Sequence, residues 1–337
     1  MRDIPVAIIG ATGLVGSTLL SLLKEQGVAA SSLHLAASKQ SAGSKIDYDG
    51  QSLVIHDLAD FDFSKTKIAF FCVGNDLAEQ YAPLATKAGN VVIDKSYYFR
   101  NHADVPLIIP EVNPEALADY KKLNIISSPN CNTIPIAVGL KSIYDAAGIT
   151  RINIATYQSV SGTGRDAMNE LTEQTRQILA DQPVHPKIYP QQIAFNVLPH
   201  IDDFLENGYT REEMKMVWEL RKIFNDPELA INPTAVRVPV FYGHSAAVHI
   251  ETRDKITAKQ AEQLLQQAAG VTLVTGQFPY PTPVVNAAGK DKVFVGRVRE
   301  DISFANGLDL WIVADNLRKG AALNALQIAN QLIDTYL

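Results

Sequence analysis

The chain has 337 residues, of which 47% are hydrophobic and 20% charged, a composition typical of folded globular proteins and long enough for about two domains. Its 30 basic and 36 acidic residues give a formal charge of −6 without any basic block, which excludes the charge pattern of a nucleic-acid or anionic-membrane binder. Two cysteines, Cys72 and Cys131, make a disulfide framework improbable, and no apolar run approaches the roughly 18 residues that span a bilayer. With no secretory leader at the N-terminus, we expect a cytoplasmic protein whose partners are small molecules.

The N-terminal part alternates short apolar runs with amphipathic helical patterns. We expect helices at Leu14–Gln26 and Leu77–Ala88, and strands at Val6–Ile9, Leu33–Ala37, Lys67–Cys72, Val91–Asp94, Leu107–Ile109 and Leu123–Ile126. Strands and helices in this succession predict a parallel sheet with right-handed crossovers.

From about Arg151 the strands become longer and alternate between apolar and polar residues. They are expected at Ile152–Val160, Ala235–Val240, Ala246–Thr252, Val293–Val298 and Leu308–Ala314, with helices at Arg165–Asp181, Thr210–Phe224 and Thr257–Ala268. This pattern predicts a mixed α+β domain with a broad sheet. The last helical pattern, Arg318–Leu337, carries an apolar stripe that would pack on the first domain. We therefore predict one domain from residues 1–130 with 316–337, and another from residues 131–315.

A glycine motif with the spacing G-x-x-G-x-x-G lies between the first strand and the first helix. Glycines there let a pyrophosphate approach the backbone, and the helix N-terminus offers free N–H groups and a positive dipole. The alternative is a tight turn without a ligand. The motif assigns these residues to cofactor binding: Gly10, Thr12, Gly13, Leu14, Val15 and Gly16.

The end of the second strand predicts which nicotinamide cofactor binds. NAD sites place an acidic residue there for the ribose 2′-hydroxyl, yet no Asp or Glu occurs between Val28 and Ile46. Hydroxyls, an amide and a lysine suit a 2′-phosphate instead, which favours NADP. The residues concerned are Ser38, Lys39, Gln40 and Ser41.

Cys131 follows an apolar strand and opens a helical pattern that runs to about Ala147. The positive end of a helix dipole favours a thiolate, so Cys131 is a candidate nucleophile. The alternative is a small buried hydrophobic residue. Cys72 has no comparable setting and is interpreted as structural, near the nucleotide.

Seven colinear segments resemble bacterial aspartate-β-semialdehyde dehydrogenases over essentially the whole chain. They are GATGLVG (10–16), DVPLIIPEVN (104–113), SPNCNT (128–133), TYQSVSGTG (156–164), EEMKMVWELRKI (212–223), VRVPVFYGHS (236–245) and LDLWIVADNLRKGAALNALQIA (308–329). The resemblance implies a glyceraldehyde-3-phosphate-dehydrogenase-like α/β fold, with a Rossmann-like domain and a mixed α+β catalytic and dimerisation domain. It also implies a homodimer that reduces aspartyl phosphate with NADPH, on the route to lysine, methionine, threonine and diaminopimelate.

The same resemblance implies a role for each matching residue. Cys131 would carry a thioester, His244 would act as acid and base, and Gln158 would orient the substrate. The substrate-binding residues would be Arg237 for the α-carboxylate, Glu212 for the amino group, Lys215 and Arg100 for the phosphate, and Asn130 for the phosphate or the oxyanion. Ser161, Gly162 and Asn316 would line the nicotinamide end of the cofactor. No metal ligand is assigned.

Local patterns and departures complete this set. A capping box from Thr210 to Glu213 predicts that Glu212 and Lys215 share one helix face, where the alternative is an exposed ion pair. For His244 the alternative is a buried core histidine. The chain departs from the usual family residues at Asn132 (Ser or Thr), Gln40 (Arg), Ala246 (Glu) and the bulky run Lys95–Tyr98.

Two other functions remain open at this level. An N-acetyl-γ-glutamyl-phosphate reductase shares the chemistry, but its usual Gly-Cys-Tyr-Pro-like context is absent around Cys131. A catalytically inactive paralogue that acts as a binding protein would lack Cys131 or His244, and both are present.

Overall fold

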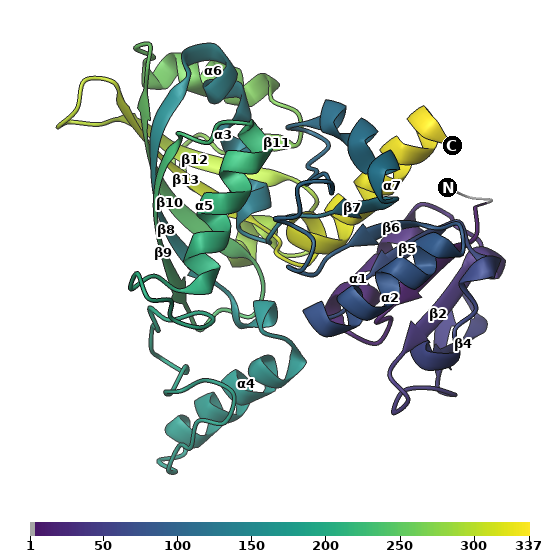
Figure 1. Ribbon diagram of the computed structural model, residues 1–337. Helices are drawn as coiled ribbons and strands as arrows, with labels where there is room; N and C mark the ends of the chain where they lie inside the picture. Colours follow the sequence, from purple (N-terminus) through teal and green to yellow (C-terminus); the bar gives the residue numbers. More distant parts are fainter. Residues whose placement is uncertain (1–3) are drawn as a thin grey trace. The chain divides into compact units, whose positions relative to one another are not determined.

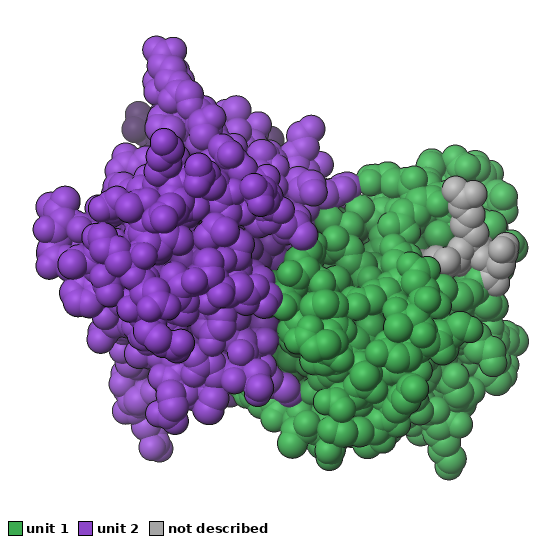
Figure 2. All heavy atoms as spheres, turned by 90° about the horizontal axis from the view of Figure 1, so that it is seen from above, with its two compact units in different colours: residues 1–130, 321–337 green, residues 131–320 purple. Residues whose placement is uncertain are grey.

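The computed structural model describes residues 4–337, and the chain divides into two compact units (Figure 2). The first unit joins the chain up to Asn130 with Ala321–Leu337, and the second is Cys131–Gly320. The predicted domains divided the chain at 315/316 instead of at 320/321. None of the helices within residues 4–337 has the length and hydropathy that crossing a membrane requires.

The first unit is built on a seven-stranded sheet in the order β3-β4-β2-β1-β5-β6-β7. All neighbouring strands are parallel except β3 and β4. The strands are β1 Val6–Ile9, β2 Leu33–Ala37, β3 Lys45–Tyr48, β4 Gln51–Asp57, β5 Ile68–Phe71, β6 Val91–Asp94 and β7 Ile125–Ser127. The predicted parallel sheet is confirmed.

Two apolar layers cover the faces of this sheet. The side chains of β1 alternate between them: Val6 and Ile8 share one core with α1 (Leu14–Glu25) and α7 (Leu323–Tyr336). Ala7 and Ile9 share the other core with α2 (Asn75–Lys87). Burial on both faces explains why these strands read as continuous apolar runs. The C-terminal helix thus completes the core of the N-terminal segment.

One local expectation for this unit is wrong, and two elements were not predicted. Leu107–Ile109 forms no strand, only an isolated bridge from Leu107 to Ser127, and the segment Pro114–Lys122 is a 3-10 helix. The antiparallel hairpin of β3 and β4 was missed, because its residues are mostly polar and exposed. Its turn is Asp49-Gly50, with φ of 57° and 76°, and Asp-Gly between two strands is itself a strong hairpin signal.

The second unit has a six-stranded sheet in the order β11-β12-β13-β10-β8-β9. The strands are β8 Ile149–Gln158, β9 Ala230–Arg237, β10 His244–Thr252, β11 Val271–Leu273, β12 Val293–Glu300 and β13 Gly307–Ala314. The mixed α+β prediction is confirmed, although β9 begins earlier than expected and β11 was missed. The helices α3 (Thr133–Ala147), α5 (Arg211–Phe224) and α6 (Ala258–Gln267) pack against one face of this sheet (Figure 1).

The ends of four strands bring polar side chains to one end of this sheet. Gln158, the last residue of β8, pairs with Arg237, the last residue of β9. His244, the first residue of β10, pairs with Ala314 at the end of β13, two positions before Asn316. Because β8 and β10 run antiparallel, the end of one strand lies beside the start of the other. A fourth helix, α4 (Arg165–Leu179), has its own small core with residues of the segment that follows it.

Candidate active site

The glycine motif of the first unit is held by close backbone packing. Gly10 has a φ of 84°, and a Cβ there would overlap the carbonyl oxygen of Cys72. A Cβ on Gly16 would overlap the carbonyl oxygen of Gly10, whereas at Gly13 the same oxygen would be 3.4 Å away. Gly10 and Gly16 are therefore required by the packing of the backbone. Gly13 is exposed and is the N-cap residue of α1.

The second predicted cofactor segment lies beside this loop. The N–H groups of Gly10 and Ala11 donate to the carbonyl of Ala36 near the end of β2, at 2.8 and 3.3 Å. Ser38, Lys39 and Gln40 follow and are exposed. The strand order reverses at β1, the position where open α/β sheets bind nucleotides. The glycine loop, the open helix start and the reversal of the strand order together fit the binding of a dinucleotide.

Cys72 follows β5 directly, and burial raises the pKa of its thiol to about 12. A thiol with so high a pKa is a poor nucleophile at neutral pH. This agrees with the interpretation of Cys72 as a structural residue.

Cys131 begins the second unit, directly before the helix α3. The N-cap of α3 is Asn132, and the Asn132 Nδ2 atom lies 3.8 Å from the Sγ atom of Cys131. A Cβ on Gly320 would lie 3.2 Å from the Cβ of Cys131, so this glycine lets the chain pass close to the thiol. The cysteine is half-buried.

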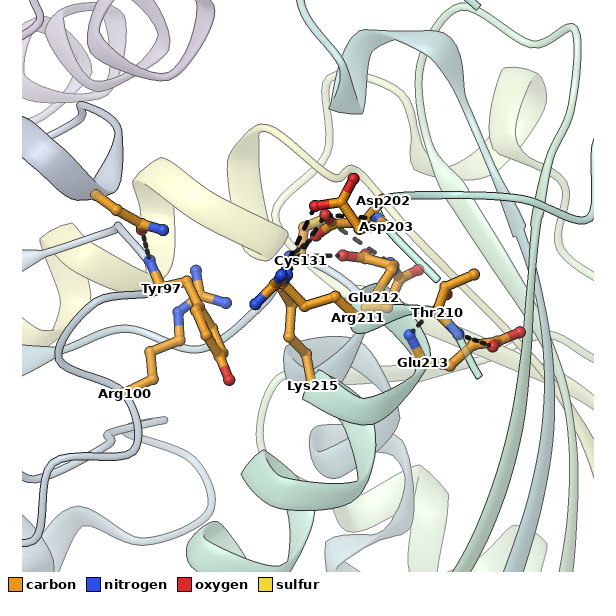
Figure 3. A network of polar contacts seen from close by, with 12 residues as sticks. Tyr97, Arg100, Cys131, Asp202, Asp203, Thr210, Arg211, Glu212, Glu213 and Lys215 are labelled. Carbon is orange, nitrogen blue, oxygen red and sulfur yellow. Dashed lines mark hydrogen bonds and ion pairs between the residues drawn. The ribbon is translucent and has the colours of Figure 1, made fainter. Parts of the chain in front are cut away.

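A carboxylate 81 positions later in the chain connects Cys131 to other predicted residues. Glu212 Oε1 accepts hydrogen bonds from Asn132 Nδ2 at 3.2 Å and from Gln158 Nε2 at 3.3 Å. Glu212 Oε2 forms an ion pair with Lys215 Nζ at 3.2 Å. Figure 3 shows Glu212 and Lys215 side by side in this polar network. Glu212 is buried, so it is not the exposed helical ion pair considered from the sequence.

The start of α5 fixes the direction of these two side chains. The predicted capping box is present: Thr210 Oγ1 accepts from the N–H of Glu213, and Glu213 Oε2 accepts from the N–H of Thr210. Lys215 Nζ also lies 2.7 Å from Asp202 Oδ2. Burial opposes ionisation of Asp202, but hydrogen bonds from Lys215 and the Asp203 backbone, and the charges of Lys215 and Arg211, lower its pKa.

His244 is buried, and its two ring nitrogens have different surroundings. The backbone N–H of Ser159 donates to Nδ1 at 3.0 Å, and Ser159 Oγ lies 3.1 Å from the same nitrogen. Because an N–H can only donate, Nδ1 accepts and the neutral ring carries its hydrogen on Nε2. Within the described chain Nε2 has no hydrogen-bond partner. Burial first, and the charge of Arg237 second, hold the pKa of His244 well below its usual value.

Gly162 lies directly beside the side chains of His244 and Arg237. A Cβ on Gly162 would lie 3.0 Å from Arg237 Nη1 and 3.2 Å from His244 Nε2. Arg237 is buried and donates to the carbonyl of Ser159 at 2.8 Å, and among the described residues its Nε has no hydrogen-bond partner. Two donors thus lie close to Gly162, and the missing side chain of this glycine keeps both of them uncovered.

The side chain of Asn316 forms hydrogen bonds to three residues around His244. Its Oδ1 atom accepts from the N–H of Gly243 at 2.9 Å and from the hydroxyls of Ser159 and Ser161 at 3.2 Å each. Its Nδ2 atom donates to Ser161 Oγ at 3.0 Å. Asn316 therefore positions the residue before His244 as well as the two serines.

The remaining predicted residues, Arg100 and Asn130, belong to the first unit. Arg100 is buried and donates to the carbonyl of Lys95 at 2.8 Å, and Asn130 is also buried. Lys95, one of the bulky departures, donates to Ser128 Oγ at 2.8 Å and to the carbonyl of Pro129 at 3.3 Å. The long side chain of Lys95 thus supports the segment that leads to the cysteine.

The sequence did not single out Ser159 or Asp202, which contact His244 and Lys215 directly. Ser159 lies inside the segment TYQSVSGTG, next to Gln158, and a polar residue at the end of a strand was a usable signal. Asp202 has a φ of 69° in an irregular segment, so its meeting with Lys215 had no sequence signal that we recognise.

Comparison with known proteins places the chain in a family. The sequence profile described as "Semialdehyde dehydrogenase, NAD binding domain" matches residues 5–120, and that described as "Semialdehyde dehydrogenase, dimerisation domain" matches residues 140–319. An aspartate-semialdehyde dehydrogenase of Shewanella sp. (strain DB6705) is 52% identical over 335 residues, which cover 99% of each chain. One from Legionella pneumophila is 54% identical over 333 residues, covering 98% of this chain and 96% of that protein.

Solved structures agree with these sequences. The crystal structure of aspartate semialdehyde dehydrogenase II from Vibrio cholerae matches with a TM-score of 0.98 and 51% identity, covering 100% of both chains. A second structure of that protein, complexed with ASA, matches equally well. The predicted fold class, a Rossmann-like domain with a mixed dimerisation domain, is confirmed. The chain belongs to the aspartate-semialdehyde dehydrogenase family.

Proposed function

We propose that the protein converts L-aspartyl 4-phosphate to L-aspartate 4-semialdehyde and phosphate, using NADPH and a thioester on Cys131. The observation that carries this proposal is the set of contacts at Glu212. One buried carboxylate holds the amide next to Cys131, the amide of Gln158 and the ammonium group of Lys215. A nucleophile, an orienting amide and groups of both charges in one place suit a substrate that carries an amino group and an anion.

In the first step the Cys131 thiolate attacks the acyl carbon of the aspartyl phosphate. A carbon–sulfur bond forms, the carbon–oxygen bond to the phosphate breaks, and inorganic phosphate leaves with the bonding pair. Lys215 and Arg100 are assigned to the phosphate, because cations at the leaving group stabilise its charge in the transition state. Asn130, beside the cysteine, is assigned to the phosphate or to the oxyanion.

In the second step the thioester carbon is reduced by a hydride, which NADPH supplies when bound. The carbonyl oxygen then becomes an oxyanion, and His244 Nε2 is the group assigned to hydrogen-bond it and to exchange its proton. The carbon–sulfur bond then breaks, which releases the aldehyde and restores the Cys131 thiolate. The backbone N–H of Ser159 supports this assignment, since it keeps the hydrogen of the neutral ring on Nε2.

The substrate itself would be held by two buried charges. Arg237 is assigned to the α-carboxylate, and its Nη1 atom borders the same space as His244 Nε2. Glu212 is assigned to the amino group, and Gln158 to orienting the reacting carbon. Ser161, Gly162 and Asn316 are assigned to the nicotinamide end of the cofactor.

NADP is the cofactor that we propose for the first unit. The free backbone N–H groups at the N-terminus of α1, which follows Gly13, would bind the pyrophosphate. The other residues of this site would be Gly10, Thr12, Leu14, Val15 and Gly16. The exposed segment with Ser38, Lys39, Gln40 and Ser41 would bind the 2′-phosphate, and Gln40 in place of the usual arginine makes Lys39 the main cation.

We propose that the second unit forms a homodimer through the sheet face that α3, α5 and α6 leave uncovered. Tyr157 on β8 is exposed on this face, and its ring packs against Trp311 on β13 with 5.5 Å between centroids. Exposed aromatic surface of this kind is typical of subunit interfaces. A cytoplasmic location is also proposed, consistent with two cysteines that remain free thiols.

The experiment that tests this function is phosphate-dependent reduction of NADP⁺. The purified protein is assayed with L-aspartate 4-semialdehyde and, separately, with N-acetyl-L-glutamate 5-semialdehyde. We expect turnover with the first substrate only, and nearly none in Cys131→Ser, which should fold and bind NADPH normally. Equal turnover with the N-acetylated substrate, or activity retained in Cys131→Ser, would contradict the proposal.

A further inference from the structure

Asn132 occupies the N-cap of α3, yet its side chain does not act as a cap. Asparagine is among the best N-cap residues because its side-chain oxygen accepts from the first free N–H groups of a helix. Here, within the described residues, the Asn132 side chain makes no hydrogen bond to the start of α3, and its backbone is helical with φ −91° and ψ −38°. The usual reason for an asparagine at this position is therefore missing.

The amide of Asn132 instead faces the nucleophile and the buried carboxylate. Its Nδ2 atom lies 3.2 Å from Glu212 Oε1 and 3.8 Å from Cys131 Sγ. Nδ2 carries two hydrogens, so one amide group can serve both acceptors. The side chain is 2% exposed, so water does not compete strongly for these bonds.

Glu212 determines which way this amide points. A carboxylate accepts only, so it selects the NH₂ end of Asn132 and excludes the flipped orientation that would turn the amide oxygen toward the sulfur. The same Oε1 atom accepts from Gln158, so Glu212 holds two amides at once. Glu212 thereby acts on Cys131 through the amide of Asn132.

We propose that Asn132 is a positioning residue that stabilises and orients the Cys131 thiolate through its Nδ2–H group, with its own orientation set by Glu212. The proposal deepens the function above, since it assumes that Cys131 works as a thiolate nucleophile. It assigns a role to a residue that differs from the serine or threonine usual at this position. A serine or threonine hydroxyl carries a single hydrogen, so it cannot donate to both acceptors at once.

The test measures the ionisation of Cys131 in the free protein. The rate of iodoacetamide alkylation is followed from pH 6 to 10, and peptide mass spectrometry separates Cys131 from Cys72. Asn132→Ala and Asn132→Asp should both raise the pH midpoint of Cys131 alkylation by about one unit, and lower its rate at neutral pH by up to about tenfold. In the enzyme assay kcat should fall, with the high-pH part of the profile losing least.

Two cap-forming substitutions, Asn132→Ser and Asn132→Asp, test positioning against a structural role. Aspartate is an equally good helix cap. A residue that only stabilised the start of α3 would leave the neutral cap variant Asn132→Ser stable with an unchanged midpoint. Asn132→Asp loses the N–H donor and also adds a negative charge beside Cys131, so it should show the largest shift. Serine is also a good N-cap residue, so Asn132→Ser should fold. Its hydroxyl has only one hydrogen to donate, so this variant should also raise the pH midpoint of Cys131 alkylation.

Asn232→Asp on the exposed part of β9 is the matched control, and its midpoint should equal that of the wild type. Unchanged midpoints in Asn132→Ala and Asn132→Ser, with intact thermal unfolding, would overturn the proposal, even if the added charge of Asn132→Asp shifts its midpoint. The alkylation measurement needs no substrate or cofactor. Its failure can therefore be told apart from a failure of the proposed function, which is tested by the turnover of Cys131→Ser.

Discussion

Lys215→Met tests whether Lys215 serves the phosphate or only the fold. Methionine keeps an unbranched apolar stem and removes the charge. In the structure the Nζ atom lies 2.7 Å from Asp202 Oδ2 and 3.2 Å from Glu212 Oε2, and the lysine side chain is 13% exposed. The substitution therefore has two separable effects, one on the free protein and one on the bound anion.

The effect on the free protein follows from the two carboxylates. Loss of their partner should cost about 1–3 kcal/mol of the free energy of unfolding, a decrease of a few degrees in Tm. Lys215 helps to lower the pKa of Asp202, and a lowered pKa stabilises the fold above the unfolded value of about 3.9. The stability difference between wild type and variant should therefore be full at neutral pH. It should shrink as the pH falls below about 3.9 and through the lowered pKa of Asp202 in the folded protein.

The effect on phosphate is a lost charge-assisted hydrogen bond. Such a bond contributes roughly 1.5–3 kcal/mol, so the KM for phosphate should rise about 10- to 150-fold, while the KM for the semialdehyde changes little. The measurement is phosphate-dependent NADP⁺ reduction at varied phosphate and at varied semialdehyde.

Two variants separate these effects. Asp202→Asn combined with Lys215→Met removes one of the two carboxylates that lose Lys215, so stability should recover in part while the phosphate KM stays high. Lys222→Met removes a lysine from the same helix and should leave the phosphate KM unchanged. If Lys215→Met is folded and its phosphate KM stays within twofold of the wild type, the phosphate assignment is wrong and Lys215 is a structural cation.

Further variants address the other parts of the site. Gly162→Ala places a methyl group 3.0 Å from Arg237 Nη1 and should raise the semialdehyde KM and lower kcat about 5- to 150-fold, the range for overpacking; unaltered kinetics would show that this space is not the substrate site. Burial lowers the pKa of His244, so its ring should stay neutral at pH 6 by ¹⁵N NMR, and the stability gained above the unfolded value of about 6.5 should be lost as the pH falls below it; a ring charged at pH 6 would refute this. The ratio of kcat/KM for NADP over NAD should exceed one and fall in Lys39→Met; a wild-type ratio below one would contradict the 2′-phosphate assignment. Trp311→Asp should dissociate the dimer in sedimentation experiments, and a stable, active wild-type monomer at micromolar concentration would remove the dimer proposal.

Local sequence features determined the parts of this protein that depend on neighbouring residues. The apolar runs of β1, β5 and β6 follow from burial on both faces, and the Thr210–Glu213 capping box places Glu212 and Lys215 on one helix face. Gly16 is required because a Cβ there would overlap the carbonyl oxygen of Gly10. These features involve residues within a few positions or one strand–helix unit, so their patterns are visible in the chain.

The contacts of the candidate site depend on pairings between distant segments, which no local pattern encodes. Strand register places Gln158 beside Arg237, and the packing of α5 brings Glu212 to Gln158 and to the amide next to Cys131. The hydrogen of the His244 ring is placed by a backbone N–H group 85 positions earlier in the chain. The sequence determined which residue types are available for the chemistry, and the tertiary structure decided which of them meet, because register and packing are settled by the burial of whole strands and helices and not by the polar residues they carry.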